Sequence, residues 1–233
     1  MSKINGAIGL ARTSAMYKRL KISPIKALYK YYTPNNINMA GGIPLDSTFP
    51  FQSLKVGLDD GSSYSVEKGV DLHLNYHMSD GVRPLRDWAH EHVKSVHSPP
   101  FEHNVSLTVG STDSWYNIVN MFGADCILFD EYVYGASITP CTTVGNQAIG
   151  VKSDGHGIIP DELRRTVLTA RNKGFKVDLL YTIPVGHNPL GLTIPLERKQ
   201  ELYKVCQELD LVIIEDGETL QAASNQTCMF SYS

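Results

Sequence analysis

The second half of the chain alternates between short apolar runs and longer amphipathic segments. The apolar runs are NVSLTVG at 104–110, CILFDE at 126–131, KVDLLYTIP at 176–184 and LVIIED at 211–216. Helical spacing of apolar residues marks the segments 113–122, 160–174 and 195–209. Continuous apolar runs are typical of strands buried on both faces, and strands separated by helices favour parallel pairing. The pattern therefore predicts an α/β fold with a parallel-rich sheet and helices on both of its faces.

The first part of the chain has a different character. Residues 1–60 are rich in Pro, Gly and Asn, which is typical of an extended arm with turns, and one helix is expected there around Pro24–Tyr31. A second helix is expected over 83–96, where apolar residues recur near helical spacing. Residues 217–233 show neither a helix nor a strand pattern. We therefore divide the chain into an N-terminal arm at 1–60, a large domain at 61–216 and an irregular tail at 217–233.

Charge and cysteine content argue against several classes of partner and site. The chain has 21 Lys and Arg against 24 Asp and Glu, and no like-charge block that would bind nucleic acid or a membrane surface. No run of about 18 apolar residues is present that could span a bilayer. The four cysteines are widely spaced, which predicts neither a metal site nor a disulfide framework. We expect a cytoplasmic protein with no nucleic acid and no membrane partner; a mitochondrial location is the alternative, because the N-terminus is basic and free of acidic residues.

Polar residues stand where the apolar runs end, and ligands of open parallel sheets bind beyond the carboxyl ends of the strands. Gly110, Ser111 and Thr112 follow the first run and open a helix, whose free N–H groups and positive dipole end would cradle a phosphate. Simple capping of that helix is the alternative. Tyr132 and Tyr134 follow the second run, where a ring could stack on a flat ligand, although tyrosines are also common in turns.

Two further strand ends offer polar side chains. Asn188 lies in a turn with two prolines and two glycines, which would either aim its amide at a ligand oxygen or serve the turn alone. Asp216 ends a buried run, where an unpaired carboxylate is unfavourable, so this residue requires a partner. A protonated pyridine nitrogen would satisfy it and keep a bound ring electron-withdrawing. A helix N-cap is the alternative role.

The order and spacing of these segments resemble the fold type I pyridoxal-phosphate (PLP) aminotransferases of class I/II, and among them the fungal aromatic, kynurenine and 2-aminoadipate subgroup. The strings that carry the resemblance are MAGGIPLDSTFPF, LNYHMSDGVRPLRDW, TVGSTDSW, DEYVY and YTIPVGHNPLGLTIPLERKQELYKVCQELDLVIIED. It covers roughly residues 19–216 and is most specific over 181–216. It implies the PLP-transferase fold type I, with residues 61–216 as an incomplete PLP-binding large domain.

The resemblance also implies which residues hold the cofactor, pyridoxal 5'-phosphate. Gly110–Thr112 match the segment that grips its phosphate, and Tyr134 matches the aromatic residue that stacks on its ring. Asn188 matches the asparagine that bonds the phenolic oxygen, and Asp216 matches the carboxylate that bonds the pyridine nitrogen. These assignments agree with the positions that the strand ends indicate.

Residues before the sheet gain roles from the resemblance alone. Tyr76 is similar to a tyrosine that reaches the phosphate of the neighbouring subunit in a homodimer, and Gly42 is similar to a substrate-side backbone contact. The resemblance further implies transfer of an amino group from an aromatic or 2-aminoadipate-type amino acid to a 2-oxo acid.

The sequence departs from the family pattern in three places. Thr112 stands where the family has Gln, and Thr219 stands where it has the tyrosine of Asp-x-x-Tyr. The Ser-x-Lys segment with the Schiff-base lysine, which the family has after the strand-end aspartate, does not occur between Asp216 and Ser233. We therefore expect a C-terminally truncated member of the family that is inactive as this chain; the alternative is a noncatalytic PLP-binding or dimer-partner protein. A nucleotide-binding domain is disfavoured, because no GxGxxG or GxxxxGK[ST] string occurs.

Overall fold

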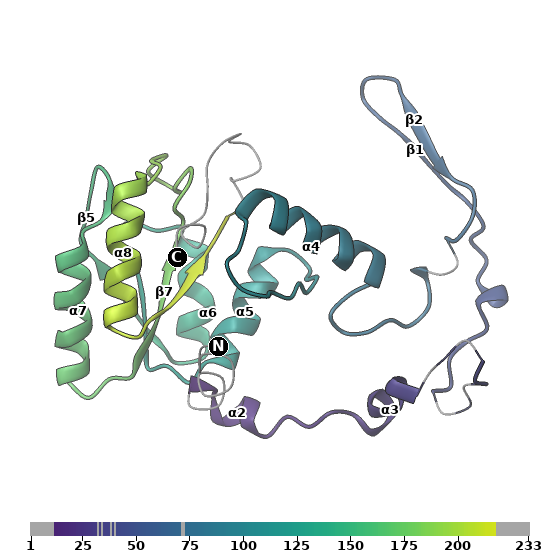
Figure 1. The fold of residues 1–233 in the computed structure, drawn as a ribbon, viewed down its shortest axis with the longest axis horizontal. Helices are drawn as coiled ribbons and strands as arrows, with labels where there is room; N and C mark the ends of the chain where they lie inside the picture. The colour runs from purple at the N-terminus through teal and green to yellow at the C-terminus, as the bar shows by residue number, and fades with distance from the viewer. Residues whose placement is uncertain are drawn as a thin grey trace. The chain divides into compact units, whose positions relative to one another are not determined.

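The computed structural model describes residues 12–31, 33, 35–37, 39, 41–70 and 73–217 of the chain (Figure 1). They form two compact units. The sheet unit contains the described residues of 1–20, 89–104 and 108–233, and the hairpin unit contains those of 21–88 and 105–107. Each unit is described by itself below.

A four-stranded parallel sheet is the centre of the sheet unit. Its strands are β3 (Cys126–Asp130), β4 (Gln147–Val151), β7 (Val177–Thr182) and β8 (Val212–Glu215). Their order across the sheet is β4-β3-β7-β8, and each neighbouring pair is parallel. The carboxyl ends of all four strands therefore meet at one edge, and the predicted α/β fold with a parallel sheet is confirmed.

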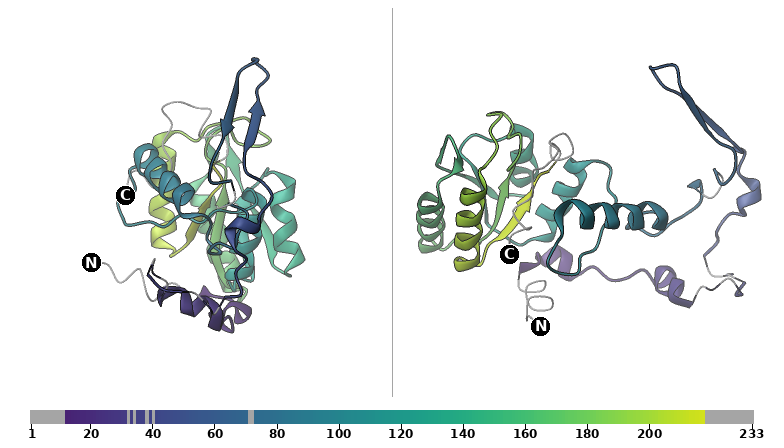
Figure 2. Two further views of the ribbon diagram at one scale, coloured as in Figure 1. Left: turned by 90° about the vertical axis from the view of Figure 1, so that its right-hand side faces the viewer. Right: turned by 45° about the horizontal axis from the view of Figure 1, so that its top comes forward.

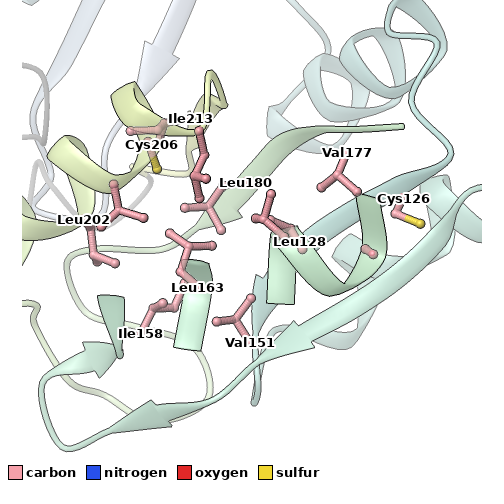
Figure 3. Packing of buried hydrophobic residues seen from close by; sticks show 14 of the residues in the cluster. Cys126, Leu128, Val151, Ile158, Leu163, Val177, Leu180, Leu202, Cys206 and Ile213 are labelled. Carbon is pink, nitrogen blue, oxygen red and sulfur yellow. The ribbon is translucent and has the colours of Figure 1, made fainter. Parts of the chain in front are cut away.

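Helices cover both faces of this sheet (Figures 1 and 2). On one face lie α7 (Pro160–Asn172) and α8 (Leu196–Glu208), and on the other lie α5 (Ser111–Met121) and α6 (Ile138–Thr143). Because side chains alternate along a strand, β3 sends Leu128 into the first layer and Phe129 into the second. Figure 3 shows the first layer, where Leu128, Leu163 of α7 and Leu202 of α8 are fully buried.

Local signals in the sequence explain where these helices begin and end. Pro160 occupies the first turn of α7, where its missing N–H removes no hydrogen bond of the helix. Asp161 and Glu162 complement the positive end of the helix dipole. Past its end, Gly174 has a φ of +87°, a conformation that favours glycine. The N-terminal α2 (Ala15–Lys18) is held to the same unit, because the Ser14 hydroxyl donates to the Asn120 carbonyl at 2.7 Å.

Two short strands and a one-turn helix complete the sheet unit. The strands β5 (Ser153–Asp154) and β6 (Gly157–Ile158) form an antiparallel hairpin, and the 3₁₀ helix η4 (Gly135–Ser137) precedes α6. Arg198 of α8 donates to both carboxylate oxygens of Asp154, at 3.1 and 3.0 Å, and so ties the hairpin to the helix.

The hairpin unit contains α3 (Pro24–Ala27), the 3₁₀ helices η1 (Leu28–Tyr31) and η2 (Asp46–Thr48), and an antiparallel hairpin. The hairpin strands are β1 (Leu54–Gly57) and β2 (Ser63–Val66). The predicted helix at Pro24–Tyr31 is thus confirmed, with a 3₁₀ second half. The helix predicted over 83–96 is α4 (Arg83–His97), whose residues up to 88 belong to this unit and whose remainder belongs to the sheet unit.

The strand predicted over 104–110 is wrong, because the structure has no strand there. The backbone groups of this segment form hydrogen bonds to partners that are not in a strand. The Leu107 N–H donates to the Asp80 carbonyl at 3.0 Å, and the Val105 carbonyl accepts from Arg86 Nε at 3.0 Å. The structure instead adds β4, which the apolar pattern did not predict. Among the helices that the structure describes, none has both the length and the apolar character to cross a bilayer.

Candidate functional site

A pocket of about 260 Å³ opens at the carboxyl edge of the parallel sheet. It collects residues that follow different strands or open α5. The residues that line it are Ser111, Thr112, Trp115, Tyr134, Ala136, Ser137, Tyr181, Ile183, Gly186, Asn188 and Asp216. We call it the strand-end pocket. Its position agrees with the expectation that ligands of open α/β sheets bind beyond the carboxyl ends of the strands.

The N-terminus of α5 forms one side of the strand-end pocket. Gly110 precedes the helix with φ 85° and ψ 168°, a conformation nearly restricted to glycine, and the Ser114 N–H donates to its carbonyl at 3.3 Å. The N–H groups of the first turn of a helix have no acceptor within that helix, and the first turn of α5 begins with Ser111 and Thr112. Together with the helix dipole and two hydroxyl groups, they make this side suited to a phosphate.

Hydrogen bonds fix the segment that leads into α5. The hydroxyl groups of Thr108 and Ser114 lie 2.6 Å apart, and the Thr108 hydroxyl donates to the Gly110 carbonyl at 3.1 Å. The Asp113 carboxylate accepts from the Val109 N–H at 3.2 Å. These contacts hold Gly110 in its conformation with a positive φ of 85° and an extended ψ of 168°.

A carboxylate faces the strand-end pocket from the end of β8. The Tyr181 hydroxyl donates to Asp216 Oδ2 at 2.5 Å, and the Asp216 N–H donates to the Thr182 carbonyl at 3.0 Å. Asp216 is half-buried, whereas Tyr181 is only 2% exposed. The partner that the buried run LVIIED requires is thus supplied in part by a tyrosine, and Asp216 keeps a second oxygen for a ligand.

Two aromatic side chains of the pocket lining, Trp115 and Tyr181, pack against each other and against Phe129. The ring of Tyr181 lies 4.9 Å from that of Trp115 and 5.4 Å from that of Phe129, measured between centroids. Trp115 Nε1 donates to the Ser137 carbonyl at 2.7 Å, and the Ser137 hydroxyl donates to the Tyr134 carbonyl at 2.7 Å. This chain of contacts connects α5 to the loop after β3, where Tyr134 is 46% exposed.

Asn188 lies on a tightly bonded loop after β7. Its neighbour His187 donates a backbone N–H to the Leu192 carbonyl at 2.8 Å, and the Gly186 N–H donates to the Thr193 hydroxyl at 3.2 Å. The His187 side chain is fully buried, with Nε2 3.7 Å from a carboxylate oxygen of Asp130 at the end of β3. The loop therefore holds the Asn188 amide at a defined place in the pocket wall.

The structure brings most of the predicted cofactor residues together. Ser111, Thr112, Tyr134, Asn188 and Asp216 line the strand-end pocket. Gly110 is the residue before α5. They come from four separate parts of the chain, and their common location follows from the parallel order of the strands.

The two remaining predicted residues belong to the hairpin unit. Tyr76 is 73% exposed, and its backbone N–H donates to the Asn75 side-chain oxygen at 2.8 Å. Gly42 has a φ of +56°. Their roles stay predictions.

Sequence reasoning missed six of the residues that line the pocket, and the two large aromatic ones among them are Trp115 and Tyr181. Both are apolar positions of predicted elements, so the pattern indicates burial and gives no sign of a pocket. A reactive thiol is not part of the pocket: burial raises the pKa of the nearby Cys141 to about 12, which keeps this group neutral.

Comparison with protein-family models finds no match. Individual proteins are nevertheless similar to the chain over most of its length. The chain is 30% identical over 230 residues to the mitochondrial kynurenine/alpha-aminoadipate aminotransferase of Bos taurus, with 91% of this chain and 54% of the relative covered. It is 27% identical over 219 residues to an aromatic amino acid aminotransferase of Schizosaccharomyces pombe, with 83% and 47% covered. The chain thus spans about half the length of the curated relatives that it matches.

The fold has similar solved structures. The crystal structure of an aminotransferase of Candida albicans superposes with a TM-score of 0.78 at 28% sequence identity. The alignment covers 88% of this chain and 48% of that one.

Proposed function

This chain belongs to the fold type I aminotransferases, and on that premise we propose that the strand-end pocket binds pyridoxal 5'-phosphate. The observation that carries the proposal is the gathering of Ser111, Thr112, Tyr134, Asn188 and Asp216 around one pocket. A helix N-terminus and a carboxylate in the same pocket suit a ligand with an anionic group and a protonated ring nitrogen.

The donor set fits this cofactor group by group. The N–H groups and hydroxyls of Ser111 and Thr112 would hold the phosphate, and the exposed ring of Tyr134 would stack on the pyridine. The Asn188 amide would donate to the phenolic oxygen. The Asp216 carboxylate would accept from the pyridine N–H and hold the proton on that nitrogen. The turn at Gly110 also fits, because no heavy atom lies within 4 Å of a Cβ built there and the approach to the first turn of α5 is open.

In the family role, the substrates would be an aromatic or 2-aminoadipate-type amino acid and a 2-oxo acid. When bound, PLP supplies an electron-withdrawing ring on which the amino group can be exchanged. The residues of this chain would bind and orient that ring, and Asp216 would keep its nitrogen protonated. The names of the two relatives described above, a kynurenine/alpha-aminoadipate and an aromatic amino acid aminotransferase, support this amino acid class.

For this chain alone, we propose that PLP is held without a covalent bond and that amino transfer does not proceed. Amino transfer needs an amine that can attach to the cofactor and then move a proton. Among the described residues that line the strand-end pocket, none is a lysine. We therefore propose an aminotransferase family member that is inactive as this chain; a noncatalytic PLP-binding or dimer-partner protein is the alternative.

The hairpin unit would serve assembly in this proposal. Tyr76 would contact the cofactor phosphate of a second copy in a homodimer, and Gly42 would offer a backbone group on the substrate side. We retain the cytoplasm as the expected compartment and mitochondria as the alternative, and the bovine relative is a mitochondrial protein.

A spectroscopic titration with PLP tests the proposed function. We expect saturable binding by the purified chain, and a dissociation constant at least about fivefold higher for both Asn188→Ala and Asp216→Ala, since a lost hydrogen bond to a charged or polar ligand group is typically about 1–3 kcal/mol. Asn172→Ala, at the exposed end of α7, is the control and should bind normally. Absence of saturable binding, or unchanged binding by both pocket variants, would contradict the proposal.

The same samples test the absence of amino transfer. With an aromatic amino acid and a 2-oxo acid, the chain should give no more product than free PLP does. Borohydride reduction followed by peptide mass spectrometry should leave the lysines of the sheet unit unmodified. Turnover would contradict the proposed absence of amino transfer, and a reduced PLP adduct on one defined lysine would contradict the proposed noncovalent binding.

A further inference from the structure

Tyr181 makes the only hydrogen bond to the Asp216 carboxylate from another side chain in the described part of the chain. Its hydroxyl donates to Asp216 Oδ2 at 2.5 Å. Its ring cannot turn away easily, because Tyr181 is 2% exposed and the ring packs against Trp115 and Phe129 at centroid distances of 4.9 and 5.4 Å. The backbone of Asp216 is bonded to β7 as well, through its N–H and the Thr182 carbonyl.

We propose that Tyr181 is a positioning residue that fixes the Asp216 carboxylate toward the ring nitrogen of the bound cofactor. This inference rests on the proposed function. Tyr181 would not touch the reacting atoms: it acts through Asp216.

The chemistry of the pair supports this role. A carboxylate has two oxygens, and the bond from Tyr181 engages Oδ2, so that Oδ1 remains for an N–H donor in the pocket. A phenol is a neutral donor, so it orients the carboxylate without neutralising its negative charge. A lysine or arginine in the same place would neutralise that charge. The full negative charge therefore stays available to a protonated pyridine.

The packing of Tyr181 makes this orientation rigid. Rotation of a carboxylate that is fixed at one oxygen and at its backbone is restricted, and a ligand that binds it loses less conformational freedom. The two contacts reach Asp216 from neighbouring positions of β7, Tyr181 and Thr182, which pair with β8 in parallel register. The sheet itself thus sets the distance between the phenol and the carboxylate.

The test compares PLP with a carbocyclic analogue in which a C–H replaces the ring nitrogen. Tyr181→Phe removes only the hydroxyl and keeps the ring between Trp115 and Phe129. We expect this variant to bind PLP about tenfold more weakly than the unmodified chain, and to bind the analogue with unchanged affinity. Tyr203→Phe, on α8 against the other core layer, is the matched control and should leave both affinities unchanged.

A double-mutant cycle completes the test. In an Asp216→Asn background, Tyr181→Phe should have no further effect on PLP affinity, since it acts through the carboxylate. Equal PLP affinities of Tyr181→Phe and the unmodified chain would overturn the inference. So would an equal loss for PLP and the analogue, which would assign Tyr181 a purely structural role. Failure of the unmodified chain to bind PLP is a different outcome, because it would remove the proposed function itself.

Discussion

Gly110→Ala is the substitution whose effect can be worked out most directly from the structure. Gly110 has φ 85° and ψ 168°, a region that residues with a Cβ almost never occupy and that costs of order 1–3 kcal/mol. A Cβ built at this position meets no heavy atom within 4 Å, so a steric clash adds nothing. The expected loss of stability is therefore the backbone contribution alone, about 1–3 kcal/mol, or a fall of roughly 2–12 °C in Tm for a unit of this size.

Gly110→Ala should weaken ligand binding as well as lower stability. The strained turn can relax only by rotating the peptide that precedes Ser111, and that rotation redirects the N–H groups at the start of α5. We expect Gly110→Ala to lower the affinity for PLP and for inorganic phosphate.

The assay is thermal denaturation together with a PLP titration, and Gly155→Ala is the matched control. Gly155 also has open space around a built Cβ, but its φ lies outside the left-handed region, so alanine should be tolerated there. Equal melting temperatures for the two variants would refute the reasoning about the turn. Full PLP affinity in Gly110→Ala would refute the assignment of the phosphate side.

Three further outcomes are expected of the sheet unit. Leu163→Ala removes a fully buried side chain between α7 and the sheet and should cost about 2–5 kcal/mol in urea denaturation, whereas Leu168→Ala, on the half-exposed side of the same helix, should cost far less. Hydrogen bonds from Arg198 hold the pKa of Asp154 below its ordinary value of 3.8, so the pair stabilises the fold fully above that pH and loses this effect as the pH falls through the lowered pKa. Asp154→Asn should therefore lower the free energy of unfolding by at most about 1 kcal/mol at neutral pH. In acid the variant and the unmodified chain should be equally stable, and urea denaturation at both pH values measures this. Burial raises the pKa of Cys206 to about 12, so its thiol should not be alkylated in the folded chain at mildly alkaline pH. After denaturation the thiol should be alkylated, and mass spectrometry measures both states. Rapid alkylation of the folded chain would contradict the burial of Cys206.

The pattern of apolar residues predicts most of the sheet unit, because β3 and β7 are buried and β8, although only partly buried, is also an apolar run. It misses β4, since Gln147–Val151 is an edge strand that is only partly buried and contains Gly150. It predicts too much at 104–110, where the alternation of apolar residues is real but no neighbouring strand accepts the backbone. Whether an extended segment becomes a strand depends on partners that a local pattern does not contain.

The candidate site follows a similar division. Asn188 and Asp216 can be predicted from the sequence because polar residues at the ends of buried runs are conspicuous. Tyr181 cannot, since it lies within an apolar run and only the pairing of β7 with β8 brings its hydroxyl to Asp216. Trp115 is likewise indistinguishable from a core residue until the loop that contains Ser137 is placed against it.

The most direct test of the PLP site is hydrogen–deuterium exchange of the purified chain with and without the cofactor, read by mass spectrometry. The account predicts that PLP slows exchange in the segments around Ser111, Tyr134, Asn188 and Asp216, and leaves the outer helix α7 unchanged. Protection confined to other segments, or no protection at saturating PLP, would contradict the claim that these strand ends form the cofactor site.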